Sequence, residues 1–197
     1  MKTLLVLRHA KSDRSDAALR DHDRPLAPRG ERDAPQMGTA LVALDMIPDR
    51  ILTSTAVRAR ETAHLVAAAM GYGGEIIEEP DIYGASVDAL LDALRECGDE
   101  ATVLLVGHNP GLEELVCLLT GGHDAEAIIR LPTAGLVCLA LDVEEWSQIV
   151  PACGLLQWFL TPRIVSPLLH ASRDLPNHRT TETKRAQRRT PGEREEE

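Results

Sequence analysis

Two stretches of the chain lead from an aliphatic run into charged or histidine residues. Both runs, residues 3–7 and 102–106, start with threonine and are otherwise aliphatic; Arg8 and His9 follow the first, and His108 comes two positions after the second. Apolar runs without polar alternation are typical of strands covered on both faces, as in a parallel sheet. In such sheets ligands bind beyond the carboxyl ends of the strands. The pattern therefore predicts that these polar side chains lie where a fold of this kind performs its chemistry.

Shorter patterns predict the other elements of an α/β fold. Further strands are predicted at residues 51–53, 75–78, 135–141 and 155–160, the second of them at an edge of the sheet. Helical periodicity or capping signals predict helices at residues 29–44, 56–70, 87–94 and 110–120. Strands that alternate with helices favour a sheet rich in parallel pairs, whose strand ends share one edge.

Capping residues and prolines set the expected ends of these helices. Ser54 or Thr55 is placed to cap the second helix, which Gly71 stops, and Ser86 the third. For the fourth helix, Asn109 is a good N-cap and Pro110 suits the first helical position. In the first helix, Pro35 fits only within the first turns, which leaves its start open.

The last part of the chain differs in composition from the rest. The full length of 197 residues suits a single domain. Residues 173–197, however, hold seven basic and six acidic side chains and almost nothing apolar. Such a segment cannot bury enough surface to offset its ordering entropy, so we interpret it as a disordered tail. Its basic residues 184–189 could instead contact a polyanion.

Charge and cysteine usage exclude several classes of protein. A net charge of −10 argues against a general nucleic-acid surface, although a local basic pocket stays possible. The four cysteines show no metal-binding spacing, and reduced, buried thiols are expected. No apolar run reaches the length of a membrane span, and the first strand begins too early to leave room for a signal peptide. A soluble cytoplasmic protein without a membrane partner is expected.

Two arginines and two histidines are expected to converge at one edge of the sheet. Arg8 and His9 follow the first strand, Arg58 lies in the first helical turn after the second, and His108 follows the strand at 102–106. Arginine forks match phosphate oxygens, and nearby helix N-termini add positive potential. This combination favours binding of a small dianion. The alternative is a set of unrelated polar residues at strand ends.

A histidine at the centre of such a pocket suggests more than binding. A neutral imidazole nitrogen is a competent nucleophile toward phosphorus, so a covalent phosphohistidine route is open to His9. For that, His9 must stay neutral with one nitrogen free, usually because the other N–H donates to a backbone carbonyl. Cationic neighbours would lower its pKa, which favours the neutral form.

Three motifs carry a resemblance to a known family. Arg8-His9-Ala10 resembles the Arg-His-Gly triplet of the histidine phosphatase superfamily, with a departure at its third position. Residues 54–63 resemble the family's second arginine motif, with Arg58 at the phosphate-binding position, and residues 106–110 its second histidine motif. Residues 24–26 and 131–135 are most similar to the small SixA-type phosphohistidine phosphatases. The resemblance covers about residues 2–165.

This resemblance implies both a fold and a set of roles. The fold would be a three-layer α/β/α sandwich with a mostly parallel central sheet, the phosphoglycerate mutase-like fold, formed by a domain at residues 1–165. His9 would be the nucleophile, while Arg8, Arg58 and His108 would hold the phosphoryl oxygens and Ser12 could add a hydroxyl contact. No cofactor is expected, and no metal either, because no metal ligands are visible in the sequence.

The resemblance leaves the proton donor and the substrate open. Larger family members carry an acid that protonates the leaving oxygen, and Glu78, Glu79 and Asp81 lie in roughly that region without a motif that singles one out. Members of the small branch generally lack this acid, which favours phosphohistidine in a protein as substrate. The alternatives are a phosphatase of small phosphomonoesters, such as sugar or nucleotide phosphates, and a non-catalytic phosphate-binding protein.

Overall fold

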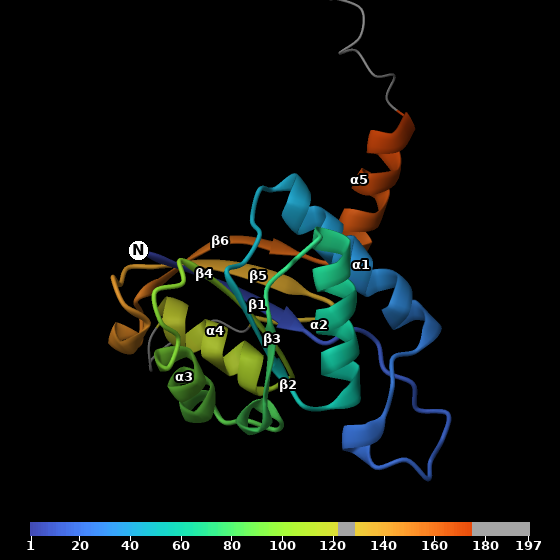
Figure 1. Cartoon of the computed structure of the whole chain (residues 1–197), viewed down its shortest axis with the longest axis horizontal. Coiled ribbons are helices and arrows are strands. Elements are labelled where there is room, and N and C mark those ends of the chain that lie inside the picture. Colours follow the sequence, from blue (N-terminus) through green and yellow to red (C-terminus); the bar gives the residue numbers. More distant parts are fainter. Residues whose placement is uncertain (122–128, 175–197) are drawn as a thin grey trace, which may run out of the picture.

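A mixed six-stranded sheet forms the middle layer of the chain in the computed structural model, which describes residues 1–121 and 129–174 (Figure 1). Its strands are β1 (Lys2–Arg8), β2 (Arg50–Ser54), β3 (Ile76–Glu79), β4 (Thr102–Gly107), β5 (Leu136–Leu141) and β6 (Gly154–Leu160). They lie in the order β3-β2-β4-β1-β5-β6. The first four strands run parallel, β5 is antiparallel to β1, and β6 is antiparallel to β5. The predicted, mostly parallel sheet is confirmed.

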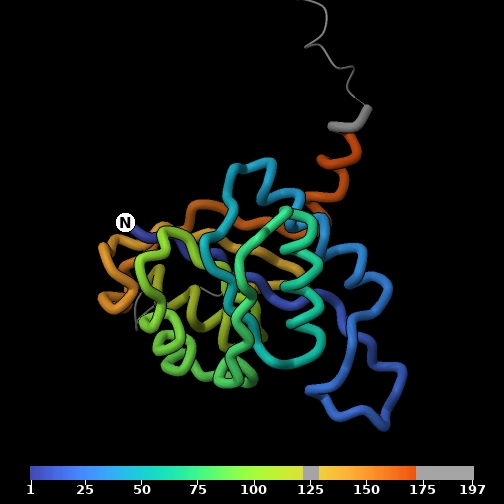
Figure 2. The backbone as a smooth tube through the Cα atoms, in the orientation of Figure 1, coloured from blue at the N-terminus to red at the C-terminus, as the bar shows by residue number. Residues whose placement is uncertain are grey.

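Helices cover both faces of this sheet. They are α1 (Pro28–Ala43), α2 (Val57–Met70), α3 (Val87–Arg95), α4 (Gly111–Gly121) and α5 (Pro162–Asp174). Helices α1 and α2 pack together on one face, with α5 against α1, while α3 and α4 lie on the other face (Figures 1 and 2). Three short 3₁₀ helices join them: η1 (Asp21–Asp23), η2 (Pro80–Ile82) and η3 (Trp146–Gln148). The expected three-layer sandwich is confirmed.

Two separate apolar cores explain why the strand sequences do not alternate with polar residues. In β1, Leu4 and Val6 belong to the core under α3 and α4, whereas Leu5 and Leu7 belong to the core under α1 and α2. All four side chains are fully buried. Complete burial of such a side chain stabilises the fold by roughly 1.5–3 kcal/mol, so both faces of β1 contribute. The sheet is thereby fixed where its strand ends carry the polar residues.

The predicted elements agree with the observed ones to within one residue at each end. The strand at residues 76–79 does form an edge of the sheet, and Gly71 ends α2 in the left-handed conformation, with φ of 66°. Ser86 caps α3, because its Oγ accepts the N–H of Ala89 at 3.3 Å.

Three expectations about helix ends are wrong. Pro35 lies inside α1, well past its first turns. A proline cannot donate to the carbonyl four residues earlier, but that residue, Glu31, is exposed and its carbonyl can bond to water. Helix α2 starts from Ala56 without a side-chain cap, because the hydroxyls of Ser54 and Thr55 bond to histidines.

The cap of α4 falls one residue later than predicted. The helix begins at Gly111, and the carbonyl of Pro110 accepts the N–H of Glu114 at 3.0 Å. The side chain of Asn109 is engaged elsewhere, because its amide donates to the carbonyl of Leu131 at 2.9 Å. Asn109 is therefore a link to a neighbouring loop rather than a cap.

Helix α5 has no counterpart among the predicted elements. It packs against α1, and its Val165 is buried in the same core as α1 and α2. The boundary expected at residue 165 falls inside this helix, and the tail expected from residue 173 overlaps its last two residues. Residues 175–197 of that tail lie outside the described part of the chain.

The structure also bears on the state of the cysteines and on whether any helix could span a membrane. No disulfide joins any of the four cysteines, all of which lie within the described residues; Cys97 and Cys138 are buried, while Cys117 and Cys153 are only partly so. Among residues 1–121 and 129–174, every helix is too short or too polar to cross a membrane.

Candidate active site

The carboxyl ends of β1, β2 and β4 bring the four predicted residues together. Arg8 is paired with Gly107 in the parallel register of β1 and β4, and the N–H of His9 donates to the Gly107 carbonyl at 3.0 Å. His108 follows immediately, and the centroids of the two histidine rings lie 5.0 Å apart. The first turn of α2, which follows β2, adds Arg58 between them. The register of the sheet therefore places all four residues in one site.

The ring of His9 is buried and held in one orientation. Its Nδ1 lies 2.7 Å from the carbonyl oxygen of Ala10, which only accepts, so this nitrogen carries the proton. Nε2 is then unprotonated and faces the Nε–H of Arg58 at 3.4 Å. Burial lowers the pKa of His9 to about 4, assisted by the charges of Arg58, Arg8 and Arg24 and opposed by the Ala10 hydrogen bond. Near neutral pH, His9 therefore presents an uncharged nitrogen with a free lone pair.

Arg58 offers two different edges of its guanidinium group. The edge formed by Nε and Nη2 faces the histidines, with Nε at 3.4 Å from His9 and Nη2 at 3.4 Å from His108. The edge formed by Nη1 and Nη2 is held by Asp21, through its backbone carbonyl and its carboxylate. One edge is therefore fixed by the protein while the other points toward the space beside the two rings.

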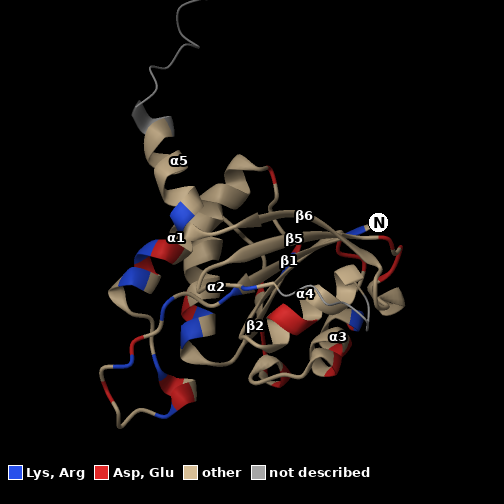
Figure 3. Ribbon diagram, turned by 180° about the vertical axis from the view of Figure 1, so that it is seen from behind, with Lys and Arg blue, Asp and Glu red and all other residues tan. Residues whose placement is uncertain are grey.

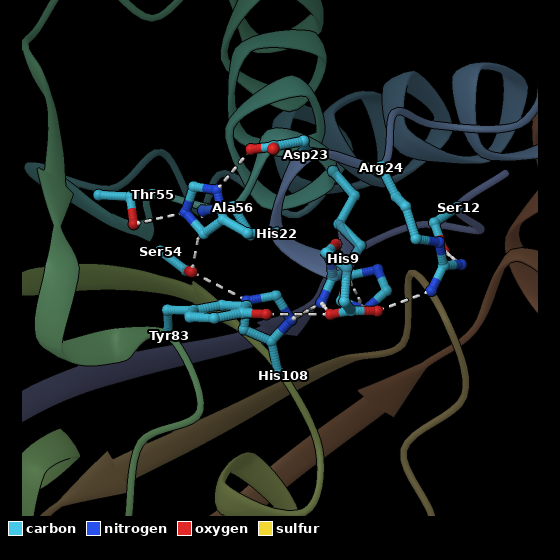
Figure 4. A network of polar contacts seen from close by, with 12 residues as sticks. His9, Ser12, His22, Asp23, Arg24, Ser54, Thr55, Ala56, Tyr83 and His108 are labelled. Carbon is cyan, nitrogen blue, oxygen red and sulfur yellow. Dashed lines mark hydrogen bonds and ion pairs between the residues drawn. The ribbon is translucent and has the colours of Figure 1, made fainter. Parts of the chain in front are cut away.

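His108 is kept neutral on the other side of that space. Its Nδ1 lies next to Arg58, which can only donate, so Nδ1 accepts and Nε2 carries the proton that it donates to Ser54 Oγ at 2.9 Å. Burial, assisted by nearby His9 and Arg58 and opposed by Asp21, lowers the pKa of His108 to about 3. Figure 4 shows Ser54 joined to one side of this ring and His9 on the other side.

Arg8 completes the floor of the site. Its Nη1 donates to the carbonyl of Leu131 at 2.7 Å, the same oxygen that Asn109 binds. Its Nε is buried without a hydrogen-bond partner in the described part of the chain. An unsatisfied buried donor is costly, and a charged one more so, unless a ligand satisfies it. Arg8 therefore lines the cleft with a guanidinium group whose hydrogen-bonding capacity the described residues do not fully use.

A polar loop, residues 11–25, forms one wall of the site and is tied to the floor through Asp21. The Asp21 carboxylate accepts from Arg58 Nη2 at 2.8 Å, from Arg24 Nη1 at 2.7 Å and from the hydroxyl of Tyr83 at 3.1 Å. Arg24 in turn donates from Nη2 to Ser12 Oγ at 2.7 Å. The predicted contact residue Ser12 is thus buried at the site, and its hydroxyl is oriented by Arg24.

These residues enclose a cleft of about 210 Å³. It is lined by Arg8, His9, Lys11, Ser12, Arg14, Asp21, Arg24, Arg58, His108, Asn109 and Thr133. Five cations and one carboxylate thus surround an uncharged imidazole nitrogen. Such a cleft can bind a compact dianion and present it to His9 for attack.

Comparison with known proteins gives the family of this chain. Residues 4–86 match the histidine phosphatase superfamily (branch 1). An uncharacterized protein of Mycobacterium tuberculosis is 37% identical over 164 residues, which cover 80% of this chain and 100% of that protein. The chain belongs to the histidine phosphatase superfamily.

Solved structures place this histidine phosphatase close to the SixA proteins. SixA of Agrobacterium tumefaciens, a candidate phosphohistidine phosphatase, is 29% identical with a TM-score of 0.69, over 82% of this chain and 98% of that one. A candidate α-ribazole-5′-phosphate phosphatase of Escherichia coli shares the fold at 17% identity and a TM-score of 0.64, over 82% of this chain and 98% of that one. The fold therefore serves phosphatases of more than one described substrate.

The acids considered as proton donors do not line the cleft of this histidine phosphatase. Glu78 lies 3.4 Å from Arg60 at the surface, and Glu79 accepts the N–H of Asp81. Among the described residues that line the cleft, Asp21 is the only acid. Partial burial opposes ionisation of Asp21, but Arg58, Tyr83 and Arg24 together lower its pKa. Asp21 is therefore ionised near neutral pH.

Sequence reasoning missed Asp21, Arg24, Tyr83 and Thr62. Asp21 and Arg24 lie in a run of charged residues in which no periodicity distinguishes one from the next. Tyr83 packs its ring edge-on against His108, with the ring centroids 5.5 Å apart. The sequence offered one signal for a role of Tyr83, because the chain has only two tyrosines.

Thr62 connects the loop that follows His9 to the first turn of α2. Its Oγ1 accepts the N–H of Ala10 at 2.9 Å and donates to the carbonyl of Arg58 at 2.6 Å. The side chain is completely buried. Thr62 therefore joins the residue after His9 to the helical turn that carries Arg58.

The described ranges hold no cluster of side chains suited to a metal ion. In them, no group of three His, Cys, Asp or Glu side chains is close enough together to bind one.

Proposed function

We propose that this chain removes the phosphoryl group from phosphohistidine in a protein, through a phosphorylated His9. The observation that carries the proposal is the absence of a protonated acid from the described cleft lining. Asp21, the one carboxylate there, is held ionised by its neighbours, and both histidines are neutral. The proposal therefore favours a substrate whose leaving group does not need a proton from a residue of the cleft.

A phosphorylated imidazole is such a substrate. In the first step, the lone pair of His9 Nε2 forms a bond to phosphorus while the P–N bond to the substrate ring breaks. The electrons of that bond return to the leaving ring, whose other nitrogen is protonated by solvent outside the cleft. The proton donor need not reach the reacting nitrogen. An alkoxide, in contrast, needs a positioned acid, which typically accelerates its departure about 10²- to 10⁴-fold.

In the second step, water attacks phosphorus and the P–Nε2 bond to His9 breaks. Inorganic phosphate leaves with the two protons of the water, and His9 recovers its lone pair. The hydrogen bond from Nδ1 to Ala10 keeps the ring in place through both steps. One proton from solvent and one water molecule are consumed for each phosphoryl group released.

The other floor residues stabilise the charge on the phosphoryl oxygens. Arg58 directs its free edge at the space beside His9, and Arg8 has an unused Nε–H. His108 can stay neutral and donate from Nδ1 to a phosphoryl oxygen if Ser54 Oγ donates to its Nε2, because a hydroxyl can either donate or accept. Preorganised donors of this kind supply a major part of catalysis in phosphoryl transfer. Ser12, held by Arg24, would contribute a weaker contact.

Small phosphomonoesters are the second candidate. The floor contacts only the phosphoryl group, and a protein with this fold is described as an α-ribazole-5′-phosphate phosphatase. The lack of a protonated acid makes esters the poorer substrates in this proposal.

The deciding experiment compares a phosphohistidine peptide with a panel of sugar, nucleotide and aryl phosphates under the same conditions, with and without EDTA. We expect kcat/KM to be about 10²-fold or more higher for the peptide, and activity to survive the chelator. A clear preference for alkyl esters would overturn the substrate assignment, and a strict need for a divalent cation would overturn the metal-free site.

A second experiment tests the nucleophile. Brief incubation with labelled substrate should leave an acid-labile, base-stable phosphate on His9. The His9→Ala variant should lose more than about 10³-fold in turnover, because the acceptor nitrogen is gone. His64→Ala, which removes an exposed histidine of α2, is the matched control. A fully active His9→Ala variant, or a label on serine, would exclude this mechanism.

A further inference from the structure

Two cations at the edge of the cleft have no side-chain partner among the residues that the structure describes. Lys11 and Arg14 line the cleft but are exposed, and neither side chain makes a hydrogen bond or an ion pair within residues 1–121 and 129–174. We call them the mouth cations. They lie on the loop at residues 11–25, which carries both basic and acidic residues (Figure 3).

The remaining charges of the cleft balance without them. Asp21 is bound to both Arg24 and Arg58, so the group of Arg8, Arg24, Arg58 and Asp21 carries a net charge of +2. A phosphoryl dianion at His9 neutralises that charge. The mouth cations are therefore in excess of what the phosphoryl group requires.

Gathering surplus cations in one place is unfavourable unless a ligand compensates them. Burial is the main cause that lowers the pKa of Arg8, and the charge of Arg14 on the neighbouring loop lowers it as well, so the two arginines repel one another. The chain as a whole is acidic, with a net charge of −10, and could supply carboxylates to pair with these cations. On the same loop, the carboxylate of Asp13 instead accepts the N–H of Ser15.

The position of the mouth cations relative to His9 is fixed by the backbone. The carbonyl of Lys11 accepts the N–H of Ala27 at 2.8 Å, and Asp13 donates to the carbonyl of Pro25 at 2.9 Å. The two ends of the loop are thus joined next to the site. The side chains of Lys11 and Arg14 extend from this fixed base.

The cleft is too small to hold much more than the phosphorylated end of a substrate. Its volume of about 210 Å³ is below the roughly 300–1,000 Å³ of pockets that enclose small ligands. The rest of the substrate must lie at the mouth, beside Lys11 and Arg14. Residues of an extended peptide are spaced roughly 3.3–3.6 Å apart, so the neighbours of the phosphorylated residue come within reach of these side chains.

We infer that the phosphohistidine of the substrate protein is flanked by acidic side chains, which Lys11 and Arg14 bind. This inference rests on the function proposed above and adds the class of protein segment that the site prefers. Because these ion pairs are the same in the ground state and the transition state, they act on KM and leave kcat nearly constant. Because they are exposed, salt weakens them.

The test uses the full-length protein and two phosphohistidine peptides that differ only in having glutamate or glutamine beside the phosphorylated residue. For the unsubstituted protein we expect kcat/KM to be roughly tenfold higher for the acidic peptide, from several exposed ion pairs of modest strength. The preference should fall as salt is raised. In the Lys11→Gln/Arg14→Gln variant the ratio should approach one.

A matched control removes the same charge elsewhere. Arg32→Gln/Arg163→Gln changes two exposed arginines, on α1 and α5, that do not line the cleft. This variant should keep the tenfold preference. Lys11→Glu/Arg14→Glu should reverse it, so that a peptide with lysine beside phosphohistidine becomes the better substrate.

The role of the mouth cations and the phosphatase activity can fail separately. If neither peptide is dephosphorylated, the proposed function is wrong. If both are dephosphorylated at equal rates, or if the preference survives in Lys11→Gln/Arg14→Gln, the role of the mouth cations is wrong while the phosphatase assignment stands. An equal loss of preference in the control variant would show a general charge effect and would also refute the inference.

Discussion

The floor of the cleft and the loop at residues 11–25 are held in place by different forces. The floor, Arg8, His9, Arg58 and His108, is attached to strand ends and a helical turn, with both His9 and Arg58 less than a tenth exposed. The loop is held mainly by ion pairs among partly exposed side chains, such as Asp21, whose side chain is 56% exposed. The floor therefore has the rigidity that chemistry requires, whereas the loop can differ without disturbing the core.

This contrast suggests that the two regions have separate tasks. Replacing a floor residue should lower turnover strongly, because preorganised donors act on the transition state. Replacing a loop residue should act more weakly. The following predictions, in order of decreasing effect, examine that division.

After His9→Ala, the largest effect is expected from Arg58→Gln. Loss of the charged edge beside His9 should lower kcat about 10²- to 10³-fold. Arg58→Lys should not restore it, because an ammonium group cannot present two parallel donors. Arg60→Gln, two residues on and paired at the surface with Glu78, is the control and should leave kcat as it is. Equal losses in the Arg58 and Arg60 variants would remove the distinction between floor and surface.

A smaller effect is expected from Asp21→Asn, where the loop meets the floor. An amide can accept from one of the two arginines but turns its NH₂ toward the other, so one edge of Arg58 loses its support. We expect about a tenfold loss in kcat, measured with the phosphohistidine peptide. Asp16→Asn, which keeps the Oδ1 that accepts from Ala18, should have no effect. A loss as large as that of Arg58→Gln would place Asp21 within the floor.

The pH dependence of stability should report on the floor alone. The pKa values of His9 and His108 are about 4 and 3 in the folded chain, against about 6.5 when unfolded, so the unfolded chain binds protons first as pH falls. The free energy of unfolding should therefore decrease below about pH 6.5, with a slope that approaches about 1.4 kcal/mol per pH unit for each histidine. Urea unfolding between pH 7 and pH 5 measures this range, above the titration of most carboxylates.

Two variants test which histidine causes the slope of the unfolding free energy against pH. His9→Asn should make the slope shallower by about half, whereas His64→Asn, at an exposed position on α2, should not change it. A slope that does not depend on His9 would mean that its ring is not kept neutral by the fold.

The smallest effect is expected from shortening the chain. Truncation after Asp174 removes residues whose composition predicts no packed structure, and helix α5 is retained. Both kcat and KM for the peptide should be unchanged. A rise in KM would assign substrate contacts to the removed residues.

The floor was largely predictable from sequence because it depends on strand register. Aliphatic runs identify buried strands, and the residues after parallel strands must meet at one edge. Arg8, His9 and His108 follow directly from that rule, and Arg58 follows from the short connection between β2 and α2.

The conformation of the loop at residues 11–25 could not be predicted from hydrophobic patterns. It depends on ion pairs such as those of Asp21 with Arg24 and Arg58, which leave no periodic pattern in the sequence. The hydroxyls of Ser54 and Thr55 illustrate the same limit, because local propensity favoured helix capping but tertiary contacts with His108 and His22 took them instead.

Gly30 has a consequence for how proteins with this fold can diversify. A side chain at this position in the first turn of α1 would collide with the backbone carbonyl of Lys11, so helix and loop approach as closely as main chains allow. Ser12 and Leu26 form a bridge at the same place. Insertions at the base of the loop would displace His9, but residues between the joined ends can be gained or lost at its tip. Such a loop can acquire new substrates over evolutionary time while the catalytic centre is inherited unchanged.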